Sequence, residues 1–467
     1  MRTRSVVVRC TVSAVLLTAV FGGIVTQGAQ GANPASGVPA DHGRVVRAAL
    51  PEGAIRHVIL IDLENESFAS TFGPGSPATY LNNTLKPQGE LIENYYATGH
   101  VSLDNYIAQV SGQAPNPLTS SDCAAVTGGA LQGLFANVTP GGLDPNQTAY
   151  PGQVDGSGCV YPQGVQTIGD QLDRTSSDDD HRRLAWRQYS EDMGNTPARD
   201  LGAADPLGGT DCAHPLVGGS DPTNTATAAD QYATRHNAFV YFHSVIDDAR
   251  SCNAHVVPLG TVAVGTGGSP DVFSGHLAQD LSRESTTPQF AFISPNLCND
   301  AHDATCHGTN VEGGTIGGLT AADLWLKHWM PLILGSPAYQ SGHTLVVITF
   351  DEGNPVTDTT SCCFEQPGPA QALPGISPLL QAFGVNPAGP GTGGGKVGAV
   401  LLNPRYIVAG TDNTTGSYNH YSALRSYEDL LGIEHGGSDG QGHLGFAGQA
   451  GLQPFGTDVF NARRHDS

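Results

Sequence analysis

Short, nearly continuous runs of apolar residues recur along this chain, and many of their side chains are β-branched. Runs that are apolar at consecutive rather than alternate positions are typical of parallel strands buried on both faces of a sheet. They lie at residues 57–63, 238–242, 290–294, 344–350 and 397–402. Stretches of helical character lie between them, at 105–110, 165–174, 228–237, 321–334 and 422–431. This alternation predicts an α/β fold with a doubly wound, mostly parallel sheet flanked by helices.

Polar, glycine-rich stretches interrupt this pattern, and they predict loop insertions or a cap on the surface. They cover residues 124–164, 194–226, 353–378 and 386–396. A chain of 467 residues has room for two or three domains, but α/β enzymes of this size with insertions often form one. We expect one catalytic domain over 53–435, a flexible segment at 33–52 before it and a loosely packed tail at 436–467 after it.

The first 32 residues have the three-part layout of a secretory signal peptide. Arg2, Arg4 and Arg9 precede an apolar run at 12–25, and small residues follow it. A membrane anchor is the alternative, but this run is shorter than the ~20 residues that a spanning helix needs, and no later run reaches that length. We therefore expect a secreted protein without a transmembrane segment.

The chain is acidic, with 43 Asp and Glu residues against 21 Lys and Arg residues and a formal charge of −22. Loss of the leader would remove three arginines and no acid, which makes the charge still more negative. An anionic surface argues against nucleic acid and anionic membranes as partners. It is compatible with a phosphorylated substrate, because a bound cation can reverse the field locally.

Nine cysteines are present, and Cys10 lies within the predicted leader. The other eight are an even number, which in an exported chain favours disulfides over free thiols. The sequence does not determine which cysteines pair. Pairing between neighbours would join Cys123 to Cys159, Cys212 to Cys252 and Cys298 to Cys306. It leaves Cys362 and Cys363 to other partners, because a bridge between adjacent residues is strained. A zinc cluster is disfavoured, since no Cys-x-x-Cys spacing occurs.

Polar residues follow three of the predicted strands at their carboxyl ends. They are Glu64 and Asn65, Asp351 and Glu352, and Asp300 and His302. Ligands of open α/β sheets bind beyond the carboxyl ends of the strands, so these side chains are expected at one edge of the sheet. Each pair alone would also fit an ordinary turn or solvated loop. Their convergence favours a binding site.

Ser102 lies at the start of a predicted helix, within the segment Gly99–Gly112. Serine often serves only as a helix cap there. A helix N-terminus also supplies positive potential and free N–H groups, which stabilise an alkoxide and a bound phosphate. A lipase-type Gly-x-Ser-x-Gly match occurs at 436–440, but it follows a predicted helix rather than a strand. We therefore prefer Ser102 as the nucleophile.

The motifs occur in the order His57–Phe68, Gly99–Gly112, Phe290–Asp303 and Leu345–Gly353. In this order they resemble the bacterial phosphoesterase family that includes secreted acid phosphatases and phospholipases C, within the alkaline phosphatase superfamily. The resemblance extends from about His57 to about Ile433 and includes Asn419–Ser422. Two segments outside the expected site also match, Trp186–Met193 and Arg235–Phe242. One departure is Asp104, where the family pattern has proline. The resemblance implies an alkaline phosphatase-like fold with glycine-rich loop insertions.

The resemblance also implies hydrolysis of phosphate esters through a phosphoserine at Ser102. The implied ligands of a divalent cation are Glu64, Asn65, Asp351 and Glu352. Mostly oxygen ligands favour Ca, Mg or Mn over Zn, which becomes possible if histidines join; one or two ions are possible. The implied substrate-binding residues are Asn105, His236, Asp300, His302 and His420. Some of these would bind a second ion or protonate the leaving group instead. His100 would line the site or orient the Ser102 loop.

The first expectation is an acid phosphatase-type phosphomonoesterase, and the alternative is a phospholipase C-type phosphodiesterase. The expected substrate is a small phosphate ester or a phospholipid head group, not nucleic acid, with a mildly acidic optimum. An inactive secreted binding protein on the same fold would have lost a motif position, and all of them are filled. A carbohydrate-binding surface protein would show repeated aromatic platforms, whereas aromatic residues make up 7% of this chain.

Overall fold

The computed structural model describes residues 46–127, 130–179, 184–196, 199–355, 357–371 and 393–462. The predicted leader, most of the segment 33–52 and parts of the insertions at 353–378 and 386–396 lie outside the described residues. Among the described residues, no helix is both long enough and apolar enough to cross a membrane.

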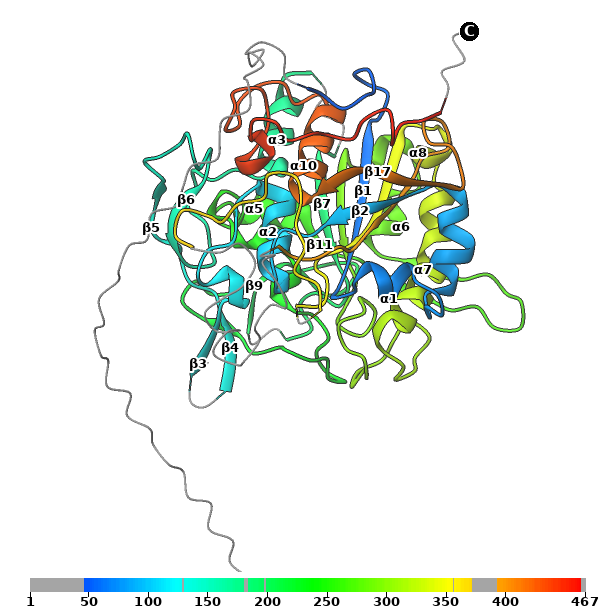
Figure 1. The fold of residues 1–467 in the computed structure, drawn as a ribbon. Coiled ribbons are helices and arrows are strands. Elements are labelled where there is room, and N and C mark those ends of the chain that lie inside the picture. Colours follow the sequence, from blue (N-terminus) through cyan, green and yellow to red (C-terminus); the bar gives the residue numbers. More distant parts are fainter. Residues whose placement is uncertain are drawn as a thin grey trace, which may run out of the picture. The chain divides into compact units, whose positions relative to one another are not determined.

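An eight-stranded sheet forms the centre of the fold (Figure 1). Its strands, in spatial order, are β11 (Val256–Pro258), β7 (Trp186–Ser190), β14 (Phe290–Ser294), β1 (His57–Leu63), β15 (Thr344–Phe350), β16 (Ala399–Leu402), β2 (Glu90–Tyr96) and β17 (Thr411–Asn419). Only β16 pairs in antiparallel fashion with its neighbours, and the other pairs are parallel. The prediction of a mostly parallel sheet is confirmed.

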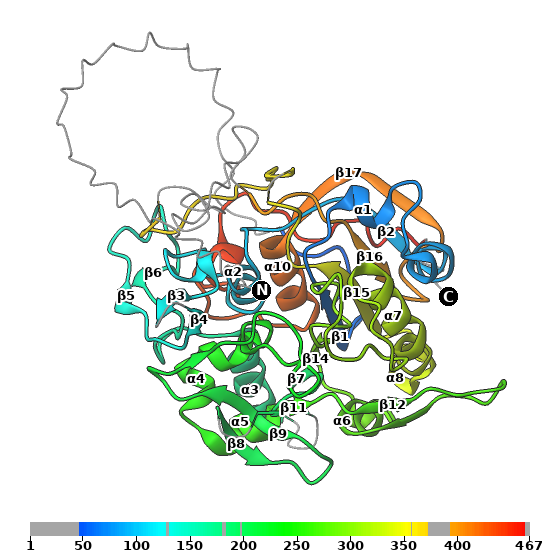
Figure 2. The same ribbon diagram turned by 90° about the horizontal axis from the view of Figure 1, so that it is seen from below.

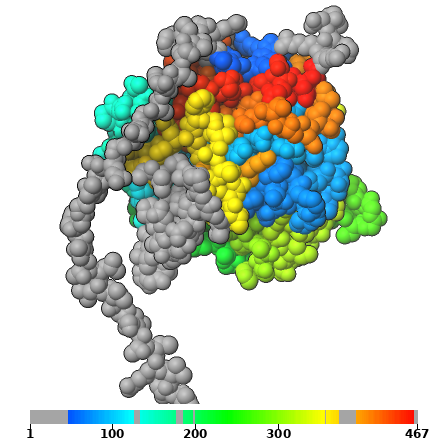
Figure 3. Space-filling view, in the orientation of Figure 1, coloured from blue at the N-terminus to red at the C-terminus, as the bar shows by residue number. Residues whose placement is uncertain are grey.

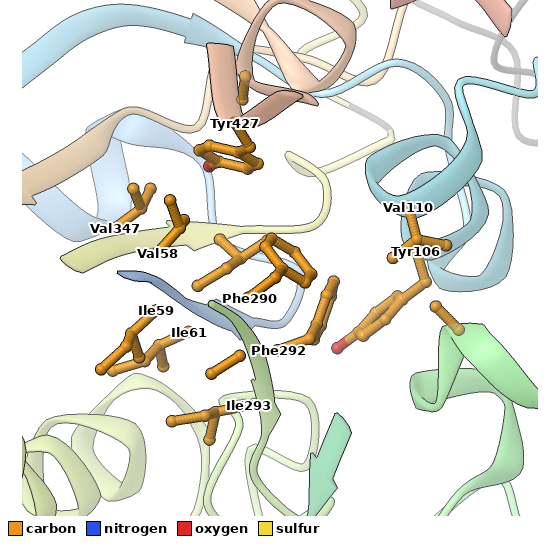
Figure 4. Packing of buried hydrophobic residues seen from close by; sticks show 14 of the residues in the cluster. Val58, Ile59, Ile61, Tyr106, Val110, Phe290, Phe292, Ile293, Val347 and Tyr427 are labelled. Atoms are coloured by element: carbon orange, nitrogen blue, oxygen red, sulfur yellow. The ribbon is translucent and has the colours of Figure 1, made fainter. Parts of the chain in front are cut away.

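The central strands are buried on both faces, as their continuous apolar runs predict. Every residue of β1, β14 and β15 is buried. Figure 4 shows Val58, Ile59 and Ile61 of β1 packed with Phe290 and Phe292 of β14. Complete burial of apolar side chains on two faces is the main stabilising contribution to this layer.

Helices cover both faces of the sheet (Figure 2). One side carries α7 (Gly318–Gly335), and the other carries α2 (Ser102–Ser111) and α10 (His420–Leu430). The predicted helices at these three places are confirmed, and α3 (Ile168–Asp179) confirms a fourth. The shorter α-helices are α1 (Phe68–Phe72), α4 (His243–Ile246), α5 (Ala249–His255), α6 (His276–Asp280) and α8 (Pro337–Gln340).

Two predicted elements are wrong. The run 238–242 is no strand, because Ala238–Tyr241 forms a 3-10 turn whose Phe239 stacks on Trp186 with ring centroids 4.4 Å apart. The segment 228–237 is no α-helix and has only the 3-10 turn Thr234–His236. An apolar or helical pattern indicates burial, and residues 231–242 of these segments are buried as a cover over the sheet rather than within it.

Four strands of the sheet are missing from the prediction: β2, β7, β11 and β17. Three of them contain too many polar residues to form an apolar run, and β11 is only three residues long. In β7, the buried Gln188 side chain donates to the hydroxyl groups of Ser190 and Ser294. Polar residues are tolerated inside a sheet when hydrogen bonds satisfy them.

The glycine-rich insertions form small antiparallel sheets. Their strands are β3 (Ala124–Thr127), β4 (Ala130–Leu134) and β10 (Ser220–Asp221), β5 (Thr139–Leu143) with β6 (Val154–Ser157), and β8 (Asp200–Ala204) with β9 (Thr210–Pro215). A further hairpin joins β12 (Thr261–Ala263) to β13 (Val272–Ser274).

The expectation of a loosely packed tail at 436–467 is wrong for its described part. Phe446, Phe455 and Phe460 are buried, and the backbone amide of Phe455 donates to Oγ of Ser426 in α10. Figure 3 shows this segment, in red, lying against its neighbours on the surface. Its aromatic side chains close the outer side of α10, so the segment belongs to the core.

Three disulfides match the pairing between neighbours: Cys123–Cys159, Cys212–Cys252 and Cys298–Cys306. The fourth bond joins Cys362 to Cys363, which corrects the expectation of other partners. The other six cysteines pair with one another, and a turn with Cys363 in the left-handed conformation brings the last two thiols together.

Candidate active site

The site begins at the turn that follows β1. The chain turns at Asn65, whose backbone is left-handed (φ 59°). The amide of Glu64 donates to the carbonyl oxygen of Asp300 (2.7 Å), and the amide of Asn65 donates to Oδ1 of Asp351 (2.8 Å). Since β14 and β15 flank β1, this turn is bonded to the segments that follow both neighbouring strands. Glu64, Asp300 and Asp351 thus meet at one edge of the sheet.

Ser102 is the first residue of α2, and its hydroxyl group is held at the end of β1. Ser102 Oγ donates to Oε2 of Glu64 at 2.8 Å, and Nδ2 of Asn65 donates to the same oxygen at 2.9 Å. The capping role falls to Asp122, whose Oδ1 accepts from the backbone amide of Leu103 (2.9 Å). The Ser102 hydroxyl is therefore not used as a helix cap.

Glu64, His236 and Asp300 form a buried group beside Ser102. His236 Nε2 lies 3.1 Å from Oε1 of Glu64, and His236 Nδ1 lies 3.2 Å from Oδ2 of Asp300. The imidazole ring stacks on Tyr106 of α2, with the centroids 5.3 Å apart. Three segments far apart in the sequence thus bring two carboxylates and an imidazole together.

Burial controls the charge states of this group. It is the main cause that raises the pKa of Glu64 well above its usual value, and the charges of Asp351 and Asp300 raise it further. Burial also raises the pKa of Asp300 and of Asp351. It lowers the pKa of His236 well below its usual value, and the positive charge of Arg235 adds to this. The positive charge of Arg235 lowers the pKa of Glu64 and of Asp300, but burial outweighs it, so the neutral carboxyl groups stay favoured.

Four polar atoms of the site are buried without a hydrogen-bond partner among the described residues: Glu64 Oε1, His236 Nε2, Asp300 Oδ2 and Asp351 Oδ2. A neutral imidazole has one N–H, so only one of the two His236 nitrogens that face Glu64 and Asp300 carries a proton. Its other nitrogen then presents a lone pair to a carboxylate oxygen. A cation between such atoms would satisfy them, so the donor set fits a divalent ion.

The sequence profile of the Phosphoesterase family matches residues 76–434, most of the chain. This chain belongs to the Phosphoesterase family. The matched range includes Ser102, His236, Asp300 and Asp351, and it begins after Glu64. The family assignment and the site geometry thus come from overlapping parts of the chain.

Fungal acid phosphatases are among its curated relatives. The chain is 26% identical over 303 residues to a phosphate-repressible acid phosphatase of Penicillium chrysogenum, which covers 64% of this chain and 49% of the relative. It is 23% identical over 398 residues to a probable acid phosphatase of Kluyveromyces lactis, which covers 84% of this chain and 62% of the relative. The chain thus matches about half of the first relative's length and under two thirds of the second's.

Solved structures overlap only loosely with this chain. A protein of the alkaline phosphatase superfamily from Vibrio parahaemolyticus has a TM-score of 0.40 and 12% identity, covering 83% of this chain and 69% of that chain. A sulfatase from Pseudoalteromonas sp. also has a TM-score of 0.40, with 13% identity, covering 88% and 73%. Overlaps of this size do not bear on the site.

Glu352 does not join the buried group of this phosphoesterase-family chain. Its Oε2 lies 2.6 Å from Nδ1 of His100, and His100 Nε2 donates to the carbonyl oxygen of Asp358 at 3.1 Å. His100 thus connects the loop before Ser102 to Glu352 and Asp358, which follow β15. The structure places Glu64 and Asp351 of the predicted cation ligands next to the site. Asn65 supports Glu64, and Glu352 is tied to His100.

His420 lies behind Asp351 rather than in the site. Its Nε2 donates to the carbonyl oxygen of Asp351 (2.8 Å), and its Nδ1 accepts from the hydroxyl of Tyr95 (3.2 Å). The direction follows because a carbonyl oxygen only accepts. Burial lowers the pKa of His420 to about 4. Both ring nitrogens are in use, so this histidine positions Asp351 and cannot bind substrate as it is placed.

The side chain of Asn105 likewise forms its hydrogen bonds with backbone groups of the protein. Its Oδ1 accepts from the backbone amides of Thr98 and Gly99, and its Nδ2 donates to the carbonyl oxygens of Gly99 and Val101. These bonds shape the loop that leads into Ser102. The expected contact with phosphate is not available in this arrangement.

Arg235 is a site residue that was not among the predicted ones, although its segment matches the family pattern. Its Nη2 donates to Nε2 of His302 at 3.1 Å, and Nδ1 of His302 donates to Oδ1 of Asp303 at 2.8 Å. The Arg235 residue is 8% exposed, and its Nε lies 3.6 Å from Oδ2 of Asp122, an ion pair too long for a hydrogen bond. A buried positive charge thus lies beside the carboxylates, and His302 serves to hold it.

A second group with metal-ligand residue types is Asp205, Asp211 and His276, whose ligand atoms lie within 4.8 Å of one another. Arg187 Nη1 donates to Nδ1 of His276 at 2.7 Å. Since this nitrogen accepts, Nε2 carries the proton and donates to Oδ2 of Asp205 at 2.5 Å. The nitrogen that faces the carboxylates is therefore protonated and has no lone pair for a cation.

Proposed function

We propose that this chain hydrolyses phosphate esters, with Ser102 as the nucleophile and a divalent cation bound by Glu64, His236 and Asp300. The observation that carries the proposal is the bond from Ser102 Oγ to Glu64 Oε2 at 2.8 Å, because the other oxygen of Glu64 faces His236. One carboxylate thus connects an oxygen nucleophile to a group of cation ligands. The family assignment and the acid phosphatase relatives support the reaction class.

The donor set influences which cation fits. Oxygen ligands alone would favour Ca, Mg or Mn, but His236 adds an imidazole nitrogen. Imidazole with carboxylate suits zinc and manganese better than calcium. Asp351 Oδ2, also without a partner, is a further candidate ligand at the same edge. We therefore propose Zn or Mn, which revises the order of ions expected from the sequence.

A bound cation lowers the pKa of a nearby hydroxyl group and neutralises phosphoryl oxygens. Ser102 Oγ attacks phosphorus, its proton passes to Glu64 Oε2, and the bond from phosphorus to the leaving oxygen breaks. The leaving oxygen takes a proton from water. In the second half, water attacks the phosphoserine, Glu64 returns its proton to Oγ, and the second proton of the water goes to solvent. Serine is then free again, and phosphate is released.

The remaining residues act on charge and position. The N-terminus of α2 and the guanidinium of Arg235 both favour the phosphoryl oxygens. His302 and His420 keep their protons on the nitrogens that face Asp303 and the carbonyl of Asp351. Neither offers a proton to the leaving oxygen, which argues against the leaving-group role expected for them.

The proposed substrate is a small phosphate monoester. The relatives' names support acid phosphatase activity, and the net charge of −22 disfavours polyanions at long range. Secretion is part of the proposal, and the leader pattern and the four disulfides support it. A phospholipase C-type diesterase is the second candidate. It would hydrolyse p-nitrophenyl phosphocholine far faster than p-nitrophenyl phosphate.

Ser102→Ala tests the nucleophile. Turnover of p-nitrophenyl phosphate should fall by ~10³-fold or more, because no other hydroxyl is bonded to Glu64 among the described residues. Ser111→Ala is the matched control at the other end of α2, where the hydroxyl donates to the carbonyl of Ile107. Acid quench of the wild type should trap phosphate on the peptide that contains Ser102. Unchanged turnover, or phosphate trapped elsewhere, would refute the serine mechanism.

A further inference from the structure

The turn after β7 lies at the edge of the sheet that carries the site. Strand β7 pairs with β14, so its carboxyl end lies beside the loop that leads to Asp300. The segment Trp186–Met193 covers this strand and turn, and the mechanism gives it no role. Asp192 within the turn has a left-handed backbone (φ 58°), which is uncommon outside glycine.

The Asp192 side chain bridges the two loops of the site. Its Oδ2 accepts from Nε2 of Gln231 at 2.9 Å and from Nδ2 of Asn296 at 2.6 Å. Gln231 lies five residues before His236, and Asn296 lies four residues before Asp300. One carboxylate oxygen thus holds both loops whose ends face each other in the candidate cation site.

The residues on each side of Asp192 also form hydrogen bonds with these two loops. Glu191 Oε2 accepts from the backbone amide of Asn296 and from Nδ2 of Asn299, both at 3.0 Å. On the other loop, Nδ2 of Asn237 donates to Sδ of Met193 at 3.4 Å. The three consecutive residues after β7 therefore reach the neighbours of both His236 and Asp300.

We infer that Asp192 is a positioning residue that sets the spacing between His236 and Asp300 and thereby the affinity for a divalent cation. This inference rests on the proposed function. His236 Nδ1 and Asp300 Oδ2 are 3.2 Å apart, and their loops are also joined by a backbone bond from Leu297 to Gln231 and by the contact of Arg235 with His302. Asp192 is the link that reaches both loops from the rigid sheet, and outer partners of this kind orient metal ligands.

Two variants, Asp192→Gly and Asp192→Asn, distinguish the effect of the hydrogen bonds of Asp192 from the effect of its negative charge. Glycine accepts the left-handed backbone without strain but removes the bridge. Asparagine also tolerates that backbone, and its one carbonyl oxygen can accept both bonds, because both go to Oδ2 in the wild type. Titration calorimetry of the metal-free proteins with Zn²⁺ and Mn²⁺ should give a Kd ~10–100-fold weaker for Asp192→Gly. Asp192→Asn should stay near the wild type.

Asp280→Asn is the matched control, because Asp280 accepts from Arg187 and Tyr189 of the same strand without contact to either loop. Its cation Kd should equal that of the wild type even if its melting temperature falls. Asn296→Asp approaches the bridge from the other side, since it replaces the donor by a second carboxylate, and it should weaken binding like Asp192→Gly. It also provides the test if Asp192→Gly does not fold.

The outcomes distinguish this inference from the proposal beneath it. Equal Kd values for Asp192→Gly and the wild type would overturn the inference alone. Equal weakening in Asp192→Asn and Asp192→Gly would also overturn it, because charge rather than position would then matter. A wild type that binds neither ion would overturn both the inference and the proposed cation site.

Discussion

Two groups of this chain have similar sets of acidic and histidine side chains, but their histidines have different hydrogen-bond partners. Each has two carboxylates and one histidine within 4.8 Å: Glu64, Asp300 and His236 in one, and Asp205, Asp211 and His276 in the other. Each ring nitrogen of His236 faces a carboxylate, whereas Nδ1 of His276 accepts from Arg187. Because Arg187 donates to Nδ1, the proton of His276 lies on Nε2, which donates to Asp205. The first group can therefore take a cation, and the second is a network of hydrogen bonds.

Removal of the histidine should show the largest difference between the two groups, in cation binding and in turnover. His236→Ala should weaken the binding of Zn²⁺ or Mn²⁺ by more than the ~10–100-fold typical of a lost outer partner, because it removes a ligand. Turnover of p-nitrophenyl phosphate should fall with it. His276→Ala should leave both quantities about unchanged. Calorimetry and steady-state kinetics measure them, and equal losses in the two variants would contradict the comparison.

Arg187→Met should sharpen the comparison by removing the donor that holds the proton of His276. The proton could then lie on Nδ1, leaving the lone pair of Nε2 to face Asp205 and Asp211. Calorimetry with Zn²⁺ should show a second, weaker binding event that the wild type lacks. Tyr189→Phe serves as the control, because it removes the other donor to Asp280 and leaves His276 untouched. One binding event in both proteins would contradict the role given to Arg187.

The smallest expected effect is on the pH dependence of stability. Burial and a hydrogen bond with Asp205 raise the pKa of Asp211 to about 7. A raised carboxyl pKa stabilises the fold below the unfolded pKa of about 4, and this contribution is lost as the pH rises through about 7. Asp211→Asn should therefore reduce the fall in melting temperature between about pH 5 and pH 8, by about 1–2 °C.

Thermal melts at a series of pH values check this prediction. Glu52→Gln is the control, because Glu52 is exposed and lies outside both groups. If the melting temperature depends on pH in the same way in Asp211→Asn and in the wild type, Asp205 and Asp211 share no proton. Solvent screening at the part-exposed Asp211 keeps the effect small.

The local sequence pattern determined the central layer of this protein. The apolar runs at 57–63, 290–294 and 344–350 predicted β1, β14 and β15 to the residue. Burial on both faces requires apolar residues at consecutive positions, so this information is local. The polar residues after these strands could be predicted to meet for the same reason, because parallel neighbours end at one edge.

Only the tertiary structure decided which polar atoms remain free. His420 has the sequence context of a site residue, but Asp351, 69 positions away, and Tyr95 use both of its nitrogens. His276 has none of that context, and Arg187, 89 positions away, decides its proton. The apolar residues of a strand are themselves enough to predict that the strand is buried. The role of an imidazole depends on the partners of both its nitrogens, and folding brings those partners from distant parts of the chain.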